Sequence, residues 1–208
     1  MEKATKRTWK KYLSLETKSS MCIKEELRED PELAELIDRH GHIDLFHSAD
    51  LYQQLVCMII EQQVSTASAR AVQERFFKQF EVTPENIIDL DDEELKNAGL
   101  SRQKAGYVKN AAEKFIKEDL DQSKFEEMTD SEAVDKLTEI KGIGEWTAEM
   151  FLMFGLGRKD VFSTGDLILR NAMQDIYSIS DRQEMRKKAE QWKPYRTIAC
   201  LYLWKEFE

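Results

Sequence analysis

Two short segments of this 208-residue chain combine residue types that could bind a ligand or act on one. The first is Gly142-Ile143-Gly144, where two glycines permit a tight turn that needs positive φ or close backbone approach. The second is Gly165-Asp166, which places a carboxylate 20 residues beyond Trp146. A carboxylate can position water or stabilise developing positive charge. Each segment also has a purely structural interpretation, since a Gly-x-Gly turn can serve packing alone and Asp166 can simply cap a helix.

Helices must position both segments, because strong helix formers fill the chain and only three prolines interrupt it. The spacing of apolar residues and the capping residues predict an all-α fold. The glycine turn falls between two predicted helices, and another predicted helix begins near Asp166. The predicted helices cover residues 51–61, 66–79, 84–88, a short stretch that ends at Gly99, 101–117, 130–140, 145–154, a stretch from about 166, and roughly 181–206.

The net charge argues against general affinity for nucleic acids, because 31 Lys and Arg stand against 40 Asp and Glu, a formal charge of −9. The charges are unevenly distributed. Residues 1–11, 99–117 and 186–196 each hold five basic residues against one acidic residue. If these segments meet on one face, they could hold a phosphate backbone, and the alternative is an ordinary solvated surface.

The N-terminal segment is charged where a secretory signal would be apolar, and no run of about 18 apolar residues occurs. These features predict a cytoplasmic protein that does not enter a membrane. Cys22, Cys57 and Cys200 are odd in number and far apart, so we expect buried apolar roles rather than disulfides or a bound cluster. His40, His42 and His47 fit no zinc template, so we expect them to be exposed or to cap helices.

The segment LTEIKGIGEWTAEMFLMF (137–154) resembles the helix-hairpin-helix motif, in which backbone N–H groups of the hairpin receive a DNA phosphate. Four other segments resemble, in the right order, parts of the helix-hairpin-helix (HhH-GPD) DNA glycosylases. The last of them is very similar to the C-terminal helix of the 3-methyladenine DNA glycosylase II type. These segments are residues 51–69, 99–108, 161–170 and 189–204.

This resemblance implies two helical lobes with an active-site cleft between them. Residues 50–157 would form a six-helix domain that carries the hairpin, and residues 1–49 would join 158–208 in a second helical domain. The implied partner is double-stranded DNA that contains damaged bases. The resemblance further implies a monomer that requires no cofactor.

Members of this superfamily that also cut the DNA strand carry a lysine where this chain has Trp146, and that amine forms a Schiff base. The chain also lacks the C-terminal four-cysteine cluster of two other branches. The resemblance therefore implies a monofunctional DNA glycosylase of the alkylation-repair branch, without lyase activity, which flips a base and hydrolyses its glycosidic bond. Two alternatives stay open, a glycosylase for neutral lesions such as hypoxanthine or uracil and a non-catalytic DNA-binding module.

Asp166 is the implied catalytic residue. Alkylated purines such as 3-methyladenine and 7-methylguanine carry positive charge and leave readily, so they need little acid catalysis. The transition state resembles an oxocarbenium sugar, which Asp166 can stabilise electrostatically, or Asp166 can position or deprotonate the attacking water.

The resemblance also implies residues that contact the flipped base. Trp146 and Trp204 match tryptophans that line the base pocket, where an electron-rich ring face attracts a cationic base. Met150 lies one helical turn after Trp146, where the best-known relatives have tyrosine. Packing in the core is the alternative for both tryptophans.

Other residues are implied to contact the DNA. Arg102 matches the position that fills the gap left by the flipped base, although relatives often use leucine there and an exposed loop arginine is the alternative. Gln62 and Gln63 either support this probing face or end a helix. Lys141 replaces the usual proline before the hairpin and could add a phosphate contact.

The hairpin itself has two implied roles. Its backbone would bind a DNA phosphate through Gly142, Ile143, Gly144 and Glu145. Its carbonyl groups correspond to a structural monovalent-cation site seen in such hairpins, formed by Thr138, Ile140 and Gly142.

Overall fold

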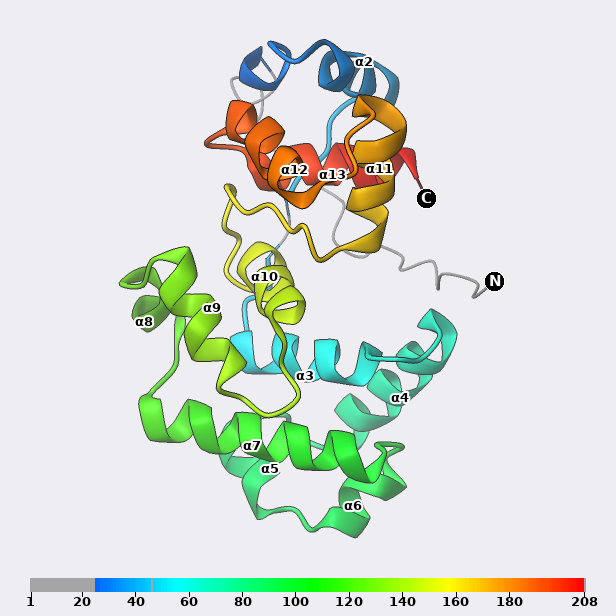
Figure 1. Cartoon of the computed structure of the whole chain (residues 1–208). Coiled ribbons are helices and arrows are strands. Elements are labelled where there is room, and N and C mark those ends of the chain that lie inside the picture. Colours follow the sequence, from blue (N-terminus) through cyan, green and yellow to red (C-terminus); the bar gives the residue numbers. More distant parts are fainter. Residues whose placement is uncertain (1–24, 46, 208) are drawn as a thin grey trace. The chain divides into compact units, whose positions relative to one another are not determined.

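The computed structural model describes residues 25–45 and 47–207, so Cys22 and the basic segment 1–11 lie outside the described residues. The described residues form helices and no β-strand, which confirms the predicted all-α fold (Figure 1). They divide into two compact units. Residues 48–151 belong to the first, and residues 25–45, 47 and 152–207 belong to the second. The chain passes from one to the other within helix α10 (Glu145–Phe154).

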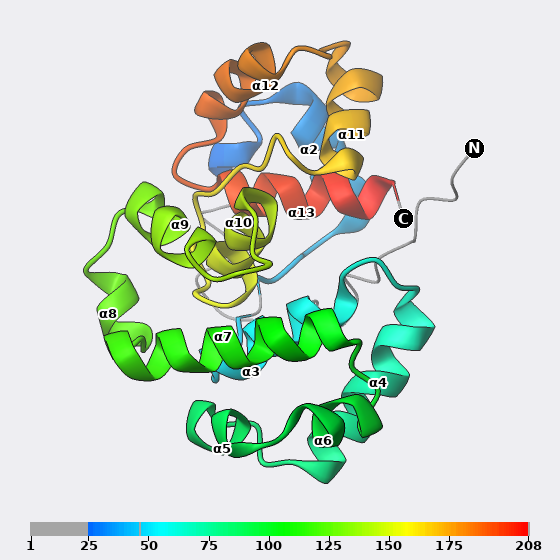
Figure 2. The ribbon, with the colours of Figure 1, turned by 60° about the horizontal axis from the view of Figure 1, so that its bottom comes forward.

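The first unit is built around α7 (Arg102–Glu118), which packs against α3, α5 and α6 and runs alongside α3 (Figure 2). Small buried residues such as Ala105, Val108 and Ala112 on α7 allow this close approach. Its other helices are α3 (Leu51–Glu61), α4 (Thr66–Gln79), α5 (Pro84–Asp89), α6 (Asp92–Asn97), α8 (Gln122–Glu126), α9 (Asp130–Thr138) and most of α10.

Side-chain caps fix where these helices begin. The Ser101 hydroxyl accepts a hydrogen bond from the Lys104 backbone N–H at the start of α7, as the sequence predicts. Thr129 and Glu132 form a reciprocal capping box at the start of α9. Each cap satisfies N–H groups that the helix itself leaves without partners. The predicted helix starts in this unit therefore follow from local sequence.

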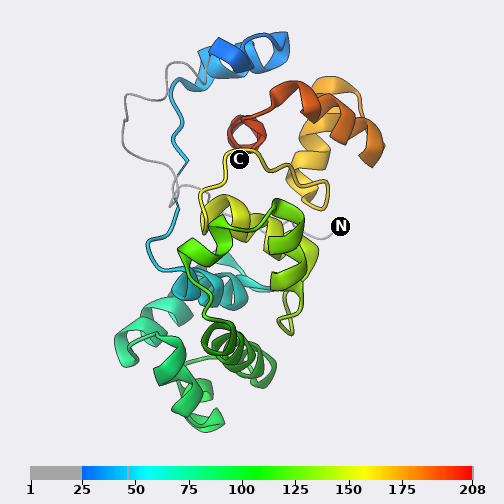
Figure 3. The same cartoon turned by 90° about the vertical axis from the view of Figure 1, so that its left-hand side faces the viewer.

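The second unit surrounds α13 (Arg196–Glu206), which contacts α2 (Pro31–His40), α11 (Leu167–Tyr177) and the 3-10 helix η2 (Glu190–Trp192). Figure 3 views α13 almost along its axis, with α11 and α12 (Arg182–Ala189) to one side. Residues 197–204 of α13 are all buried. A helix that is buried around its whole circumference forms the core of its unit.

The prediction of one helix over residues 181–206 is wrong. The α-helix stops at Ala189 and starts again only at Arg196. Pro194 lies in the gap, and proline has no N–H to donate and disfavours helical backbone at the residue before it. The break lets α12 and α13 run in different directions.

Helix α2 was not predicted, although Asp30 and Pro31 are typical of a helix start. Asp30 is buried, and its carboxylate accepts hydrogen bonds from the Leu33 N–H, the Tyr177 hydroxyl and the Trp192 indole. Its other close partner is the Lys188 ammonium, at 2.8 Å. Burial raises the pKa of Asp30, but the hydrogen bonds from Lys188 and Trp192 outweigh it and leave the pKa below its usual value. Asp30 thus joins α2 to α11, α12 and η2.

Two of the three histidines, His40 and His42, face carboxylates. His40 Nε2 lies 2.7 Å from the Glu206 carboxylate, and His42 Nε2 lies 2.7 Å from that of Asp44. Across the described ranges, no three His, Cys, Asp or Glu side chains form a group suited to a metal ion. Cys200 is buried as predicted, whereas Cys57 is only partly buried. None of the described helices combines the length and apolar character needed to cross a membrane.

Candidate functional site

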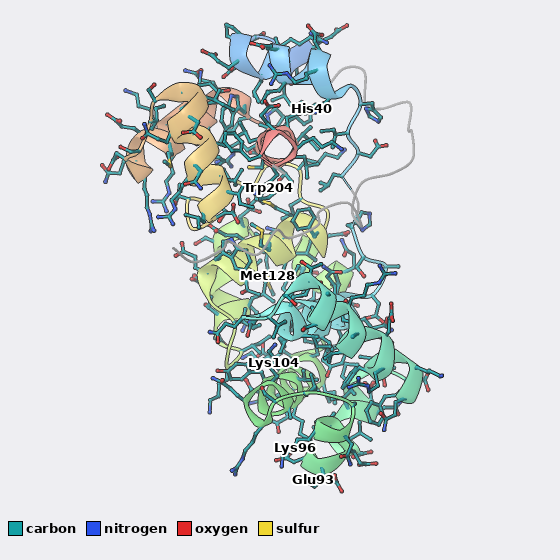
Figure 4. All side chains as sticks on the ribbon, turned by 90° about the vertical axis from the view of Figure 1, so that its right-hand side faces the viewer. His40, Glu93, Lys96, Lys104, Met128 and Trp204 are labelled. Carbon is teal, nitrogen blue, oxygen red and sulfur yellow. The ribbon has the colours of Figure 1, made fainter. Side chains whose placement is uncertain are left out.

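Asp166 is buried, with 5% of its surface exposed, and it occupies the cap position of α11. Its Oδ1 atom accepts a hydrogen bond from the Leu169 N–H at 2.9 Å. The same oxygen accepts a second one from the Trp204 indole N–H at 3.0 Å (Figure 4). Asp166 therefore does cap a helix, and the cap together with the indole fixes the orientation of its carboxylate. A fixed carboxylate needs no reorientation when charge develops beside it.

The loop that leads to Asp166 is held by the first turn of α13. The Arg196 guanidinium bonds to both carboxylate oxygens of Asp160, at 2.8 and 3.0 Å. Thr197, which is fully buried, bonds to the backbone of the loop: its N–H donates to Lys159 O at 2.9 Å, and its hydroxyl donates to Arg158 O at 2.7 Å and accepts the Val161 N–H at 2.9 Å. Helix α13 thus holds the start of this loop through Arg196 and Thr197, and its end through Trp204.

The glycine turn joins α9 to α10, and its two glycines serve different purposes. Gly142 has φ +91°, and a Cβ atom there would overlap the ring of Tyr107. Gly144 has no such restriction, because a Cβ atom there would meet nothing within 4 Å. The Gly144 carbonyl accepts the Ala148 N–H at 3.0 Å, so α10 begins directly at this exposed residue. The first N–H groups of a helix point out of its end and suit an anion.

Helix α7 supports this hairpin with Tyr107 and Asn110. The ring of Tyr107 lies against Gly142, and the Asn110 side chain accepts the Lys141 backbone N–H at 2.7 Å. From α3, the Gln62 amide donates to the Gly142 carbonyl at 2.9 Å. Tyr107 and Asn110 were not predicted as supports of the hairpin, although their spacing of three places them on one face of a helix.

Lys104 shares that face of α7 and holds the end of α3 (Figure 4). Its ammonium donates to the carbonyls of Ile60 and Gln62, at 2.7 and 2.8 Å. Burial lowers the pKa of Lys104. The carbonyls at a helix C-terminus lack partners within the helix, so Lys104 satisfies them and fixes the turn that follows.

That turn, residues 62–65, presents an exposed tip. Gln63 adopts left-handed backbone with φ +54°, and Val64 is 37% exposed. Gln62 turns its amide toward the hairpin, whereas Gln63 remains exposed. Arg102 is also exposed. It is the first residue of α7, whereas the sequence suggested a residue of the preceding loop.

The residues predicted to contact the base lie in both units. Trp146 is half-buried, and Met150 follows one turn later on α10 with 3% exposure. Trp204 belongs to the second unit, where 1% of its surface is exposed and its indole N–H is bonded to Asp166. The structure thus brings Trp204 and Asp166 together and gives Trp204 a role in orienting the carboxylate.

Residues 56–195, which include the hairpin and Asp166, match the family described as HhH-GPD superfamily base excision DNA repair protein. The chain belongs to this superfamily. The match covers most of the described chain, and it confirms the family that the sequence motifs indicate.

Individual members of the HhH-GPD superfamily are similar over most of the chain. A putative DNA-3-methyladenine glycosylase of Bacillus subtilis is 31% identical over 85% of this chain and 66% of that protein. A crystal structure of a DNA-3-methyladenine glycosidase from Bacillus halodurans has a TM-score of 0.80 and 35% identity, covering 91% of this chain and 90% of that one.

A third similar HhH-GPD protein was solved with DNA. It is the 3-methyladenine DNA glycosylase of Schizosaccharomyces pombe in complex with abasic DNA. Its TM-score is 0.76 at 30% identity, and the match covers 89% of this chain and 96% of the other. Because the match covers 89% of this chain, the likeness concerns most of its fold.

Proposed function

We propose that this chain is a monofunctional DNA glycosylase that releases alkylated purines, of the 3-methyladenine and 7-methylguanine type, from duplex DNA. The observation that carries this proposal is the buried Asp166 carboxylate, oriented by Trp204 and by the Leu169 N–H, in a member of a base excision repair superfamily. Similarity to proteins named DNA-3-methyladenine glycosylases supports the substrate class.

In the proposed reaction, the base leaves with the electrons of the glycosidic bond, and water adds to C1′ of the nucleotide and gives up a proton to Asp166 or to solvent. Positive charge builds on the sugar as that bond breaks. Burial of Asp166 strengthens its attraction for this charge, because the effective dielectric constant is lower there than in water. A cationic purine already carries the charge that makes it a good leaving group, so one fixed carboxylate is sufficient protein assistance.

The hairpin would hold the DNA for this reaction. Its turn offers the backbone N–H groups of Gly142, Gly144 and Glu145 to one phosphate, and exposed Lys141 adds a positive charge beside them. The Ile143 N–H is already bonded to the Ile140 carbonyl, so it does not join them as the resemblance implied. Tyr107 and Asn110 keep the turn in that shape. Such contacts fix the position of the duplex and carry no sequence preference, which suits an enzyme that must act at any damaged site. We propose that it acts on this duplex as a monomer.

We also propose that the hairpin holds a monovalent cation through the carbonyls of Thr138, Ile140 and Gly142. The Ile140 carbonyl accepts the Ile143 N–H at 3.0 Å, and the Gly142 carbonyl accepts the Gln62 amide at 2.9 Å. Each carbonyl oxygen has two lone pairs, so both retain one for a cation. A cation there would add positive charge next to the phosphate.

A release assay tests the substrate class. Purified protein is incubated with DNA that contains 3-methyladenine, 7-methylguanine, ethenoadenine or hypoxanthine, and the free bases are measured. We expect release of the two cationic purines and slow or no release of hypoxanthine, because a neutral base needs protonation that one carboxylate does not supply. Efficient release of hypoxanthine would instead support a glycosylase for neutral lesions. Damage-selective binding without any release would indicate a non-catalytic module.

The product should be intact abasic DNA. Trp146 occupies the place of the lysine that bifunctional members use, so no Schiff base should form there. We expect strand breaks only after alkali or heat, and no covalent complex after borohydride treatment. The control is a bifunctional glycosylase acting on its own substrate under the same conditions. A trapped complex that disappears when one lysine is mutated would contradict the proposal.

Two exposed residues, Arg102 and Gln63, are candidates to fill the gap left by a flipped base. If Arg102 fills it, Arg102→Ala should lower turnover at a lesion by on the order of 10-fold and affect undamaged duplex less, because unstacking costs a few kcal/mol per step. Gln63→Ala, at the tip of the turn after α3, is the matched comparison. Binding titrations on both duplexes decide between them. Equal weakening on both duplexes by Arg102→Ala would make Arg102 a phosphate contact.

A further inference from the structure

Arg170 lies one helical turn beyond Asp166, and its guanidinium has no partner in the described structure. Its backbone N–H donates to the Asp166 carbonyl at 3.1 Å, which places it in the first hydrogen-bonded turn of α11. The Nε atom of Arg170 is buried and has no hydrogen-bond acceptor. A buried donor without an acceptor is unfavourable, so it calls for a partner from outside the described residues, such as an ion or a ligand.

Two other arginines of this unit are paired with carboxylates. Arg28 pairs with Asp38 at 2.6 Å, and Arg196 forms its two-pronged pair with Asp160. By contrast, α11 carries no acidic residue in its first turn, and no carboxylate of the described residues forms an ion pair with Arg170. Arg170 is therefore a half-buried charged residue one turn from the catalytic candidate, and it lacks the counter-ion that Arg28 and Arg196 have.

We propose that Arg170 binds a phosphodiester of the DNA strand that carries the damaged nucleotide. This inference rests on the proposed function and adds a phosphate contact to it. Residues four apart on a helix lie about 6 Å apart along its axis, on the same side. With Asp166 facing the sugar, the Arg170 fork is within reach of a phosphate of the same or the adjacent nucleotide. Leu167, the first residue of α11, is 50% exposed, so the start of this helix reaches the surface.

The positive charge of Arg170 would favour binding of a phosphate near Asp166. The protein has a formal charge of −9, and the Asp166 carboxylate repels any phosphate brought close to it. A cation one turn away offsets that repulsion at the position where the reaction requires the strand. Arginine suits the task, because its planar fork donates two parallel hydrogen bonds to a phosphate and stays charged when partly buried. The contact would also fix the sugar relative to Asp166.

Salt dependence of binding tests the contact. The full chain is titrated onto a duplex with one stable tetrahydrofuran abasic analogue, at salt concentrations from about 50 to 200 mM. Arg170→Gln should weaken binding and lower the slope of log Kd against log salt by about 1, the value for one lost phosphate contact. Arg28→Gln removes the same charge from an arginine already paired with Asp38, so its slope should equal that of the parent.

A second measurement locates the phosphate. Neutral methylphosphonates replace single phosphates on either side of the abasic analogue, one duplex at a time. The parent should lose affinity when the phosphate held by Arg170 is neutralised, and Arg170→Gln should show no further loss at that position while still losing affinity at the hairpin phosphate. If Arg170→Gln does not fold, Arg170→Lys is used instead. Neutralising the phosphate held by residue 170 should then lower the affinity of Arg170→Lys by less than it lowers the affinity of the parent.

The inference is overturned if Arg170→Gln keeps the slope of the parent, or if the methylphosphonate pattern of the folded variant matches that of the parent at every position. Failure of the proposed function looks different, because the parent itself would then release no base or would not bind the abasic duplex. A parent that releases alkylated purines, together with an Arg170→Gln variant that behaves like Arg28→Gln, rejects only the phosphate contact.

Discussion

Asp166→Asn is expected to lower the rate of base release by about 10²- to 10⁴-fold, the range found when a positioned acid–base or charge-stabilising group is removed. DNA binding should stay equal or become tighter. The substitution removes the negative charge that faces the sugar, and it also removes the repulsion between that charge and the DNA phosphates. Activity and affinity should therefore move in opposite directions.

The fold should tolerate this substitution. The hydrogen bonds that Asp166 accepts from the Leu169 N–H and from the Trp204 indole end on the same oxygen, Oδ1. An asparagine retains that oxygen as an acceptor and is as good a helix cap as aspartate. The amide nitrogen then takes the place of the second oxygen. Loss of activity would thus report the missing charge and not a displaced loop.

Asp175→Asn is the matched control, since Asp175 is an exposed residue of the same helix. It removes one negative charge from α11 at a distance from the cap. Single-turnover release of 7-methylguanine and titration onto the abasic duplex are measured for both variants, after circular dichroism confirms folding. Near-normal turnover by Asp166→Asn, equal to that of the control, would contradict the assignment of Asp166 as the catalytic residue.

Local signals in the sequence predicted most of the helices and both candidate segments. Ser101, Thr129 and Asp166 each cap the helix that follows them, and a cap is recognised from the residues next to it. The glycine turn was predicted because glycines permit positive φ or close backbone approach, and Gly142 indeed has φ +91°. Where local signals were overlooked, as with Pro194 in the last helical stretch, the prediction was wrong.

The contacts that orient Asp166 and hold the hairpin could not be predicted from neighbouring residues in the sequence. The Trp204 indole is 38 residues from Asp166 in sequence, and the Gln62 amide is 80 residues from Gly142. Only the folded chain brings such pairs together. Trp204 therefore looked like a pocket residue in the sequence, whereas in the structure its N–H orients the carboxylate. Lys104 and Asn110 were not predicted as site residues, yet Lys104 holds the turn after α3 and Asn110 holds the hairpin.

The hairpin gives the other large expected effect. Gly144→Asp should weaken binding to damaged and undamaged duplex alike by at least about 10-fold. At an effective dielectric constant of about 20, two unit charges 4 Å apart repel by about 4 kcal/mol, and a 10-fold change needs only about 1.4 kcal/mol. Screening by salt reduces the first figure, so the loss should be larger at low salt. Release of alkylated purines at subsaturating DNA should fall in parallel.

The structure separates this effect from misfolding. A side chain at Gly144 meets open space, and the backbone there does not need positive φ, so the variant should fold. Gly106→Asp is the matched control, because Gly106 lies on α7, away from the turn in sequence, and its Cβ would also meet nothing within 4 Å. Gly142→Ala is a poor substitute, because its Cβ would overlap Tyr107 and distort the hairpin itself.

Binding titrations at two salt concentrations, with circular dichroism as the check on folding, compare the parent with Gly144→Asp and Gly106→Asp. If backbone N–H groups at the start of α10 hold a phosphate, only the first variant loses affinity, and its loss is independent of the lesion because the hairpin contacts no base. A folded Gly144→Asp protein that binds DNA like the Gly106→Asp control would mean that this turn packs the two helices without touching DNA. Asp166 would then need another element to bring the strand to it, and the arginine one turn along α11 would be the first place to look.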